Sequence, residues 1–91
     1  MMAVRVLWVT KGLGPGGAER LLVAAAGAHD RARFEIEAAY VLPYKDHLTG
    51  ELEAAGVRTN CLSVRRVDRR WPLRLWRLVR SGGFDVVHVH A

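Results

Sequence analysis

Residues 4–20 read VRVLWVTKGLGPGGAER, and this stretch decides the fold. An apolar run rich in β-forming residues fills 4–10, a glycine-rich turn follows at 11–17, and a long aliphatic segment covers 21–28. Strand, glycine-rich turn and helix in this order are typical of an open α/β sheet, where ligands bind outside the carboxyl ends of the strands. We therefore expect a parallel sheet whose first strand leads into a binding loop.

The turn holds four glycines between Gly12 and Gly17. Glycine allows positive φ angles and lets a ligand approach the backbone without meeting a Cβ atom. The helix that follows directs unpaired N–H groups and the positive end of its dipole back at the turn. The turn is therefore predicted to bind an anionic group, with phosphate as the foremost candidate. A turn with a purely structural role is the alternative.

Apolar runs and helical spacing predict three more strands and three helices. The strands cover 34–41, 57–64 and 84–91, and the helices cover 18–29, 50–55 and 71–80. Alternating strands and helices with short connections imply right-handed crossovers, so a Rossmann-like α/β fold of the pattern βαβαβαβ is expected, with a parallel sheet of strand order 3-2-1-4. The fourth strand is apolar enough to be central, whereas the third alternates as an edge strand does.

A chain of 91 residues makes one small domain at most. The sequence stops where the fourth strand ends, and a parallel strand without a covering helix is unusual. We therefore interpret 1–91 as the N-terminal part of a longer protein, a partial Rossmann-like domain truncated after the fourth strand.

Several sequence features bear on localisation. The N-terminus lacks the layout of a signal peptide, and no apolar run approaches the roughly 18 residues of a spanning helix. The lone Cys61 cannot form an internal disulfide, which agrees with a reducing compartment. A cytoplasmic location is expected.

The net charge of +5 comes almost wholly from arginine. A basic balance suits nucleic acid, an anionic membrane or a phosphorylated ligand, and it also arises from an arginine-rich coding bias. The segment 65–80 gathers arginines with Trp71 and Trp76. We interpret it as a solvated helix face with Trp76 in the core; a basic aromatic patch on anionic lipid is the second interpretation. Nothing resembles an RNA-binding module, so nucleic acid is not expected.

The glycines from Gly12 to Gly17 also fit the dinucleotide pattern G-x-G-x-x-G. That pattern requires an acidic residue near the end of the second strand to bind the ribose. The residues there are Tyr40-Val41-Leu42-Pro43, and Glu37 lies too early. NAD or FAD binding is therefore disfavoured. A Walker loop is excluded because no Gly-Lys-Ser/Thr follows the glycines.

His88 and His90 stand two apart on the fourth strand, so both point to one face. A zinc site needs a third ligand, and His29 and His47 lie in segments with no reason to converge there. No metal site is expected. His88 is predicted to lie in the core, and His90 to emerge in the same crevice as the glycine turn, where its imidazole can donate to a sugar hydroxyl or phosphate.

Taken together, three segments resemble the N-terminal half of a family 4 glycosyltransferase of the two-domain GT-B type. They are GGAER at 16–20 after the first strand, GELEAAGV at 50–57 and FDVVHVHA at 84–91. The resemblance implies transfer of a sugar, with retention and without a metal or other cofactor, from a nucleotide-sugar donor to a sugar, lipid-linked or small-molecule acceptor. It further implies a cleft between two Rossmann-like domains.

The resemblance assigns roles to few residues of this chain. It places Gly14, Gly16 and Gly17 at the donor phosphate or sugar and His90 in the cleft, on the acceptor side, while 19–20 anchor the helix. The catalytic residues are unknown and belong to the missing part, so this fragment alone is expected to be inactive. We also expect a cytoplasmic enzyme with peripheral contact to the inner face of the membrane.

Two alternatives of other classes remain open. One is a fragment of a nucleotide-binding oxidoreductase or epimerase. The other is a non-enzymatic basic α/β module that binds membrane or RNA. An acid at the end of the second strand favours the first alternative, and that acid is missing. Salt-sensitive binding to anionic vesicles, without an effect of nucleotide sugars, favours the second.

Overall fold

A computed structural model describes residues 3–14, 16–65 and 68–90 of the chain. Strands and helices alternate along it, as the sequence predicts. The elements are β1 (Val4–Thr10), α1 (Gly17–Ala28), β2 (Phe34–Tyr40), α2 (Thr49–Ala54), β3 (Arg58–Cys61), α3 (Trp71–Gly82) and β4 (Val86–His90).

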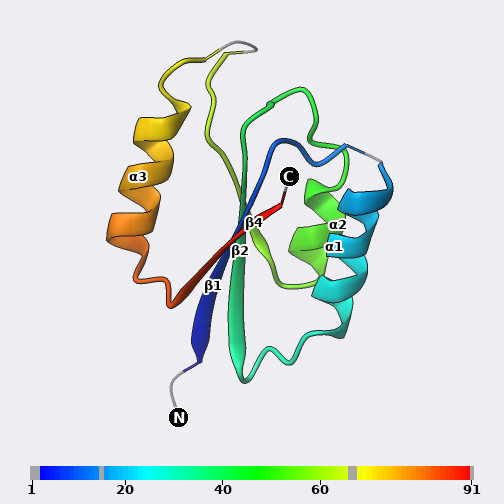
Figure 1. Ribbon diagram of the computed structural model, residues 1–91. Coiled ribbons are helices and arrows are strands. Elements are labelled where there is room, and N and C mark those ends of the chain that lie inside the picture. The colour runs from blue at the N-terminus through cyan, green and yellow to red at the C-terminus, as the bar shows by residue number, and fades with distance from the viewer. Residues whose placement is uncertain (1–2, 15, 66–67, 91) are drawn as a thin grey trace.

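The strands form one parallel sheet in the order β3-β2-β1-β4, which confirms the predicted fold class and topology. β1 lies between β2 and β4 and pairs with both along most of its length. At its carboxyl end, Thr10 lies opposite Tyr40 of β2 and opposite His90 of β4. Helices α1 and α2 cover one face of the sheet, and α3 covers the other (Figure 1).

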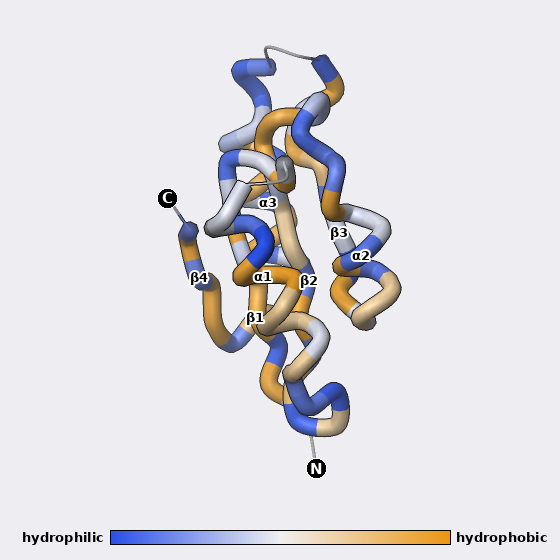
Figure 2. Tube along the Cα trace, turned by 90° about the vertical axis from the view of Figure 1, so that its right-hand side faces the viewer, coloured by the Kyte–Doolittle hydropathy of each residue, from blue (hydrophilic) through white to orange (hydrophobic). Residues whose placement is uncertain are grey.

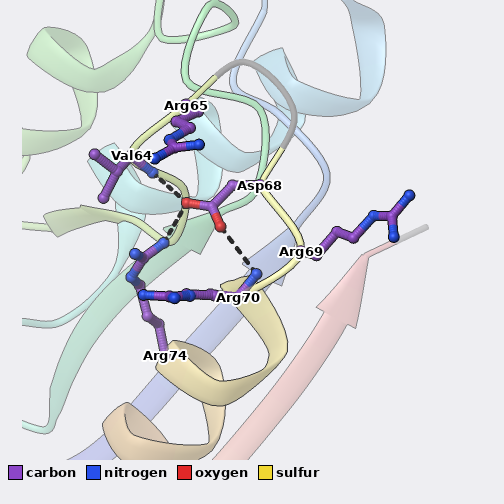
Figure 3. Close-up of a pocket in the computed structure, with 6 residues that line it drawn as sticks. All are labelled: Val64, Arg65, Asp68, Arg69, Arg70 and Arg74. Atoms are coloured by element: carbon purple, nitrogen blue, oxygen red, sulfur yellow. Dashed lines mark hydrogen bonds and ion pairs between the residues drawn. The ribbon is translucent and has the colours of Figure 1, made fainter.

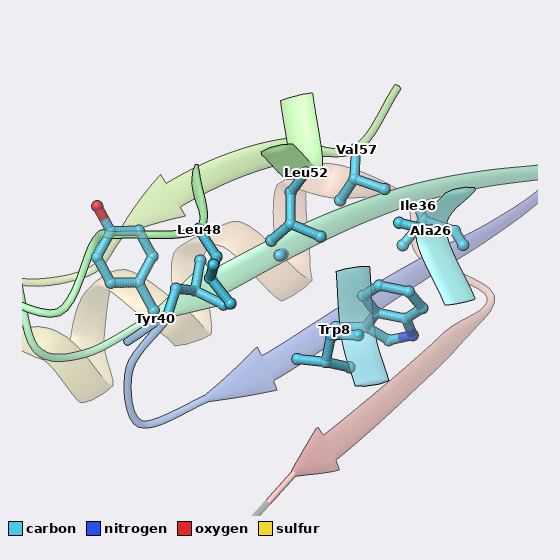
Figure 4. Packing of buried hydrophobic residues seen from close by; sticks show 10 residues of the cluster. Trp8, Ala26, Ile36, Tyr40, Leu48, Leu52 and Val57 are labelled. Atoms are coloured by element: carbon cyan, nitrogen blue, oxygen red, sulfur yellow. The ribbon is translucent and has the colours of Figure 1, made fainter. Parts of the chain in front are cut away.

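The first core cluster fills the space between the sheet and helices α1 and α2 (Figure 4). Trp8 of β1 and Ile36 of β2 point to this face, and Leu52 of α2 packs against them with none of its surface exposed. Leu13 and Leu48 belong to the same cluster although both lie in loops. The glycine loop is therefore part of the hydrophobic core at one point.

The second core cluster lies under α3. Leu7 and Val9 of β1 face it because they alternate with Trp8 along the strand. Trp71, Leu75 and Leu78 pack against this cluster at a spacing of four and three residues.

The prediction that Trp76 lies in the core is wrong, since it is 56% exposed. It sits one position past Leu75, about 100° around the helix, and so turns away from the sheet. The Arg80 guanidinium lies over the Trp76 ring, 5.4 Å from its centroid.

β4 forms an edge of the sheet, although its composition predicts a central strand. Val86, Val87 and Val89 are 47%, 43% and 67% exposed. A view turned by 90° places β4 at one side of the molecule (Figure 2). An apolar composition indicates that a strand can be buried, but whether a strand is central depends on whether other strands pair with both of its sides. β4 pairs with β1 alone among the described strands.

Arg5 joins several elements at the amino edge of the sheet. Its guanidinium forms ion pairs with Glu35 (3.3 Å) and Glu37 (3.1 Å) of β2. It also donates to the Gly82 carbonyl at the end of α3 and lies 4.9 Å from the centroid of the Phe84 ring. One side chain thus connects β1 to β2, to α3 and to the segment that leads into β4.

Replacing Arg5 with Met is expected to lower the free energy of unfolding by about 2 kcal/mol, because Glu37 loses a cationic partner and the Gly82 carbonyl loses a donor. Urea denaturation followed by circular dichroism measures the loss. The control is Arg58→Met on β3, which removes an exposed arginine and is expected to change stability by less than about 0.5 kcal/mol. Equal losses in both variants contradict the role given to Arg5.

Candidate functional site

The first half of the glycine loop is fixed by backbone hydrogen bonds to the connection between β2 and α2. The Leu13 N–H donates to the Lys45 carbonyl (2.6 Å), and the Leu13 carbonyl accepts from the Leu48 N–H (3.0 Å). The Lys11 carbonyl accepts from the N–H groups of Val41 (3.1 Å) and Leu42 (2.9 Å). This part of the loop is therefore built into the fold.

Glycine is needed at the first position of the loop for a steric reason. A Cβ atom added to Gly12 would lie 2.8 Å from Cβ of Lys45, closer than side chains pack. At Gly14 the nearest atoms are Cδ of Lys45 at 3.6 Å and Nδ1 of His47 at 3.9 Å, which is ordinary contact. Both glycines are buried. The predicted donor residue Gly14 thus lies beneath Lys45 and His47.

The second half of the loop is open. Gly16 and Gly17 are exposed, and α1 begins at Gly17 with Gly16 as its N-cap. The first helical hydrogen bond runs from the Arg20 N–H to the Gly16 carbonyl (3.0 Å), so the preceding amides have no partner within the helix. A Cβ atom added to Gly17 would meet nothing within 4 Å.

The carboxylate of Glu19 folds back over Gly16. Its Oε2 atom stands where a Cβ atom on Gly16 would lie. A carboxylate in the first turn of a helix is stabilised by the positive end of the helix dipole. Glu19 therefore occupies the region that an incoming anion would enter, and such an anion must displace it. The role of 19–20 in anchoring the helix stays a prediction.

Lys45 and His47 are candidate site residues that sequence reasoning missed. The side chain of Lys45 lies close to Gly12 and Gly14 and that of His47 lies near Gly14, and both residues are exposed. The sequence places them in an irregular loop and gives no reason for His47 to approach Gly14. Their position follows from the backbone bonds of Lys45 and Leu48 to Leu13, which bring two loops together. No sequence pattern reports such a contact.

His90 lies at the carboxyl end of β4, as predicted. Its ring stacks on His88 with 4.2 Å between centroids and meets the Trp8 ring edge-on at 6.1 Å. Burial, and to a smaller extent the neighbouring His88, lowers the pKa of His90 below 6.5, so its imidazole is neutral at pH 7. Its Nε2 atom is inaccessible and has no hydrogen-bond partner among the described residues.

His88 differs from its prediction. It is exposed, not buried in the core, because it belongs to the edge strand β4. The two histidines line a cavity of about 350 Å³ with Trp8 and, from α1, Leu21 and Leu22. Among the described residues, no three His, Cys, Asp or Glu side chains gather as they would around a metal ion.

A second cavity, of about 380 Å³, lies at the carboxyl edge of β1 on the α3 face of the sheet. It is mainly apolar, and its lining residues are Val9, Thr10, Lys11, Val41, Leu42, Trp71, Val89 and His90. His90 is common to both cavities, whereas Gly14, Gly16 and Gly17 line neither. The structure thus places His90 beside the end of β1 and the first turns of α1.

Residues 40–43, where β2 ends, include no acid that could bind a ribose. Glu37 forms an ion pair with Arg5 and accepts a hydrogen bond from the Asn60 amide at 3.3 Å. Its carboxylate therefore links neighbouring strands and does not point to the carboxyl end of the sheet. Burial, followed by the Cys61 thiol, raises the pKa of Tyr40 to about 12, and Tyr40 remains a neutral phenol. These positions disfavour a dinucleotide site for the same reason as the sequence does.

The connection between β3 and α3 holds a cluster of arginines around Asp68 (Figure 3). The Asp68 carboxylate accepts from the Val64 N–H (2.8 Å), the Arg70 N–H (2.9 Å) and the Arg74 guanidinium (2.5 Å). The Val64 N–H, then Arg74 and the Arg70 N–H, hold the pKa of Asp68 well below its ordinary value of 3.8. Arg74 also donates to the Leu62 carbonyl at 2.9 Å.

Comparisons with models of protein families, with curated proteins and with solved structures give no match to this chain. The function of the chain is therefore inferred from its own residues and from the resemblance of 16–20, 50–57 and 84–91 to family 4 glycosyltransferases. Within the described residues, none of the helices has the length and apolarity needed to cross a bilayer.

Gly12→Ala is expected to lower the free energy of unfolding by about 1–3 kcal/mol, because the added methyl group overlaps Lys45. The matched control is Gly27→Ala, where a Cβ atom meets nothing within 4 Å in the interior of α1. That change should stabilise the chain by up to about 1 kcal/mol. Thermal unfolding measures both. A neutral Gly12→Ala contradicts a structural need for this glycine.

Asp68 predicts an acid-dependent loss of stability. Its pKa is depressed in the folded chain, so its contribution is fully present above the unfolded value of about 4 and falls as the pH drops through the lower, folded value. The free energies of unfolding of wild type and Asp68→Asn should differ by a constant amount above about pH 5. This difference should shrink steadily as the pH falls below about 4. Urea denaturation at a series of pH values measures it. A difference that does not change with pH contradicts this assignment.

Proposed function

We propose that this chain is the acceptor-side half of a retaining GT-B glycosyltransferase that uses a nucleotide-sugar donor. The observation that carries the proposal is the exposed amino end of α1 at Gly16-Gly17. The glycine loop connects it to β1, at the carboxyl end of the sheet. The strand order reverses at β1, because β2 and β3 lie on one side of β1 and β4 lies on the other. Phosphate groups are bound at such crevices by the amides of a helix N-terminus. In this proposal the 91 residues form a partial domain that a donor-binding domain completes.

The chemistry of the donor explains what the loop contributes. Cleavage of a sugar–pyrophosphate bond develops negative charge on the leaving diphosphate, and preorganised N–H groups stabilise that charge without a metal. The amides at Gly16 and Gly17 supply part of this stabilisation. Lys45 and His47, beside the loop, add cationic or hydrogen-bonding groups. The diphosphate displaces the carboxylate of Glu19 when it enters.

The apolar cavity beside His90 is the proposed acceptor side of the cleft. His90 is neutral at pH 7, so its imidazole offers a hydrogen bond to an acceptor hydroxyl without placing a charge there. The lining of Val9, Leu42 and Trp71 suits a sugar face or the apolar part of a lipid-linked acceptor. Since the Nε2 atom of His90 is inaccessible, the hydrogen bond to the acceptor in this proposal comes from the other ring nitrogen, Nδ1.

A specific observation favours a peripheral membrane role for α3. Leu73, Trp76 and Val79 are exposed by 47%, 56% and 37% and follow one another at a spacing of three residues. Arg77 and Arg80 lie on the same helix and are exposed. An exposed apolar stripe flanked by arginines is suited to the interface of an anionic bilayer. We propose this contact at the inner face of the cytoplasmic membrane as an addition to the transferase role.

The donor proposal predicts that Gly17→Ala weakens nucleotide binding without harming the fold. The methyl group has open space in the free chain but stands where a phosphate must approach the amides. Titration with UDP-glucose, GDP-mannose and ADP-glucose, followed by amide shifts in NMR, should show a loss of affinity of about fivefold or more. Removal of the competing charge in Glu19→Gln should instead raise the affinity by a few-fold.

Gly27→Ala serves as the matched control, since it places the same methyl group on α1 away from the loop. It should leave the titration unchanged. Absence of any shift at Gly14, Gly16 or Gly17 with all three donors overturns the donor site. Shifts that survive Gly17→Ala unchanged overturn it as well.

A further inference from the structure

The arginine cluster between β3 and α3 surrounds a pocket of about 510 Å³. Its lining residues are Val64, Arg65, Asp68, Arg69, Arg70 and Arg74. Figure 3 shows Arg65, Arg70 and Arg74 around Asp68, whereas Arg69 points away from the other three. The described lining of the pocket therefore holds four arginines and a single carboxylate, and three of the arginines lie around that carboxylate.

Asp68 is already engaged with the protein. Two backbone N–H groups, of Val64 and Arg70, and the Arg74 guanidinium all donate to it, and its side chain is only 7% exposed. Arg74 is held at the same time by the Leu62 carbonyl. These bonds fix the walls of the pocket, because they tie the ends of the connection to one another and to the first turn of α3.

The charges in the pocket do not balance. Among the described lining residues, four arginines stand against one aspartate, so positive charge is in excess. Among the described residues, Arg74 is the one arginine of this cluster in an ion pair, so Arg65 and Arg70 have no carboxylate partner there. The first turn of α3 contains no acidic residue, and Asp68, which accepts from the N–H of the N-cap residue Arg70, is the one described carboxylate of the pocket at the positive end of the helix dipole.

We propose that Arg65, Arg70 and Arg74 form a binding site for a phosphate dianion, carried as a phosphomonoester or as the end of a diphosphate. A phosphomonoester carries a charge of about −1.5 to −2 at pH 7, which suits this excess of positive charge. Guanidinium groups bind phosphate oxygens through paired N–H bonds, a geometry that a lysine does not provide. The site stands apart from Gly16-Gly17, so it does not depend on the donor proposal.

The test is calorimetric titration of the 91-residue chain with inorganic phosphate, pyrophosphate and glucose 1-phosphate. Wild type should bind one equivalent, and R65Q/R70Q should bind about tenfold more weakly or worse, because two charge-assisted contacts are lost. Arg74 is left in place since it supports the loop. The matched control, R33Q/R58Q, removes the same charge from exposed arginines elsewhere on the molecule. It should stay within about twofold of wild type.

Equal weakening in the two double variants overturns the proposal, since it shows an effect of overall charge alone. Absence of binding to all three probes overturns it too. Should R65Q/R70Q fail to fold, the guanidinium Nε–H resonances of wild type decide. Shifts at Arg65 and Arg70 on adding phosphate support the site, and their absence refutes it.

Vesicles distinguish the source of the phosphate. Phosphatidic acid presents a phosphomonoester, whereas phosphatidylglycerol presents only a diester. A preference for phosphatidic acid that R65Q/R70Q abolishes, and that free phosphate competes away, assigns the pocket to a lipid headgroup. Binding of free phosphate without such a preference assigns it to a soluble phosphorylated ligand.

Discussion

The pairing of β1 with β2 on one side and with β4 on the other is the constraint on which the remaining structure depends. Parallel pairing in this register brings the carboxyl ends of three strands together at Thr10, Tyr40 and His90. At the opposite edge, Arg5 links β1 to Glu37 and to the end of α3, which holds β4 in place. The glycine loop follows the end of β1, and the cavity beside His90 is lined by residues from the same end of this strand, so the pairing of β1 determines where both lie.

The fold was predictable because its signals are local and agree with one another. The apolar run at 4–10, the proline at the start of α3 and the glycine at its end each favour one conformation, and Gly83 adopts a φ of 64° as its C-cap. The order 3-2-1-4 followed from the handedness of the crossovers. Errors arose where placement depends on the sheet as a whole. Trp76 and His88 are exposed because of helix phase and an edge strand, which their own residue types do not report.

The candidate site was predictable only in part, since its second wall comes from another loop. Glycine content identified the turn, but it did not separate Gly12, which is buried against Lys45, from Gly17, which is open. That division depends on the hydrogen bonds that Leu13 makes with Lys45 and Leu48. Contacts between two irregular segments leave no periodic trace in a sequence, because backbone groups of any residue type make them.

The arginines show why net charge is a weak guide to function. Arg5 and Arg74 belong to the architecture, since carboxylates and carbonyls hold their guanidinium groups. Such an arginine adds to the total charge, but part of its hydrogen-bonding capacity is already taken up by the protein. Arg65 and Arg70 differ because the nearest acid, Asp68, is already engaged by three donors. Asp68 offsets only part of the positive charge around it, so the arginines of the pocket keep an excess that an external anion can compensate.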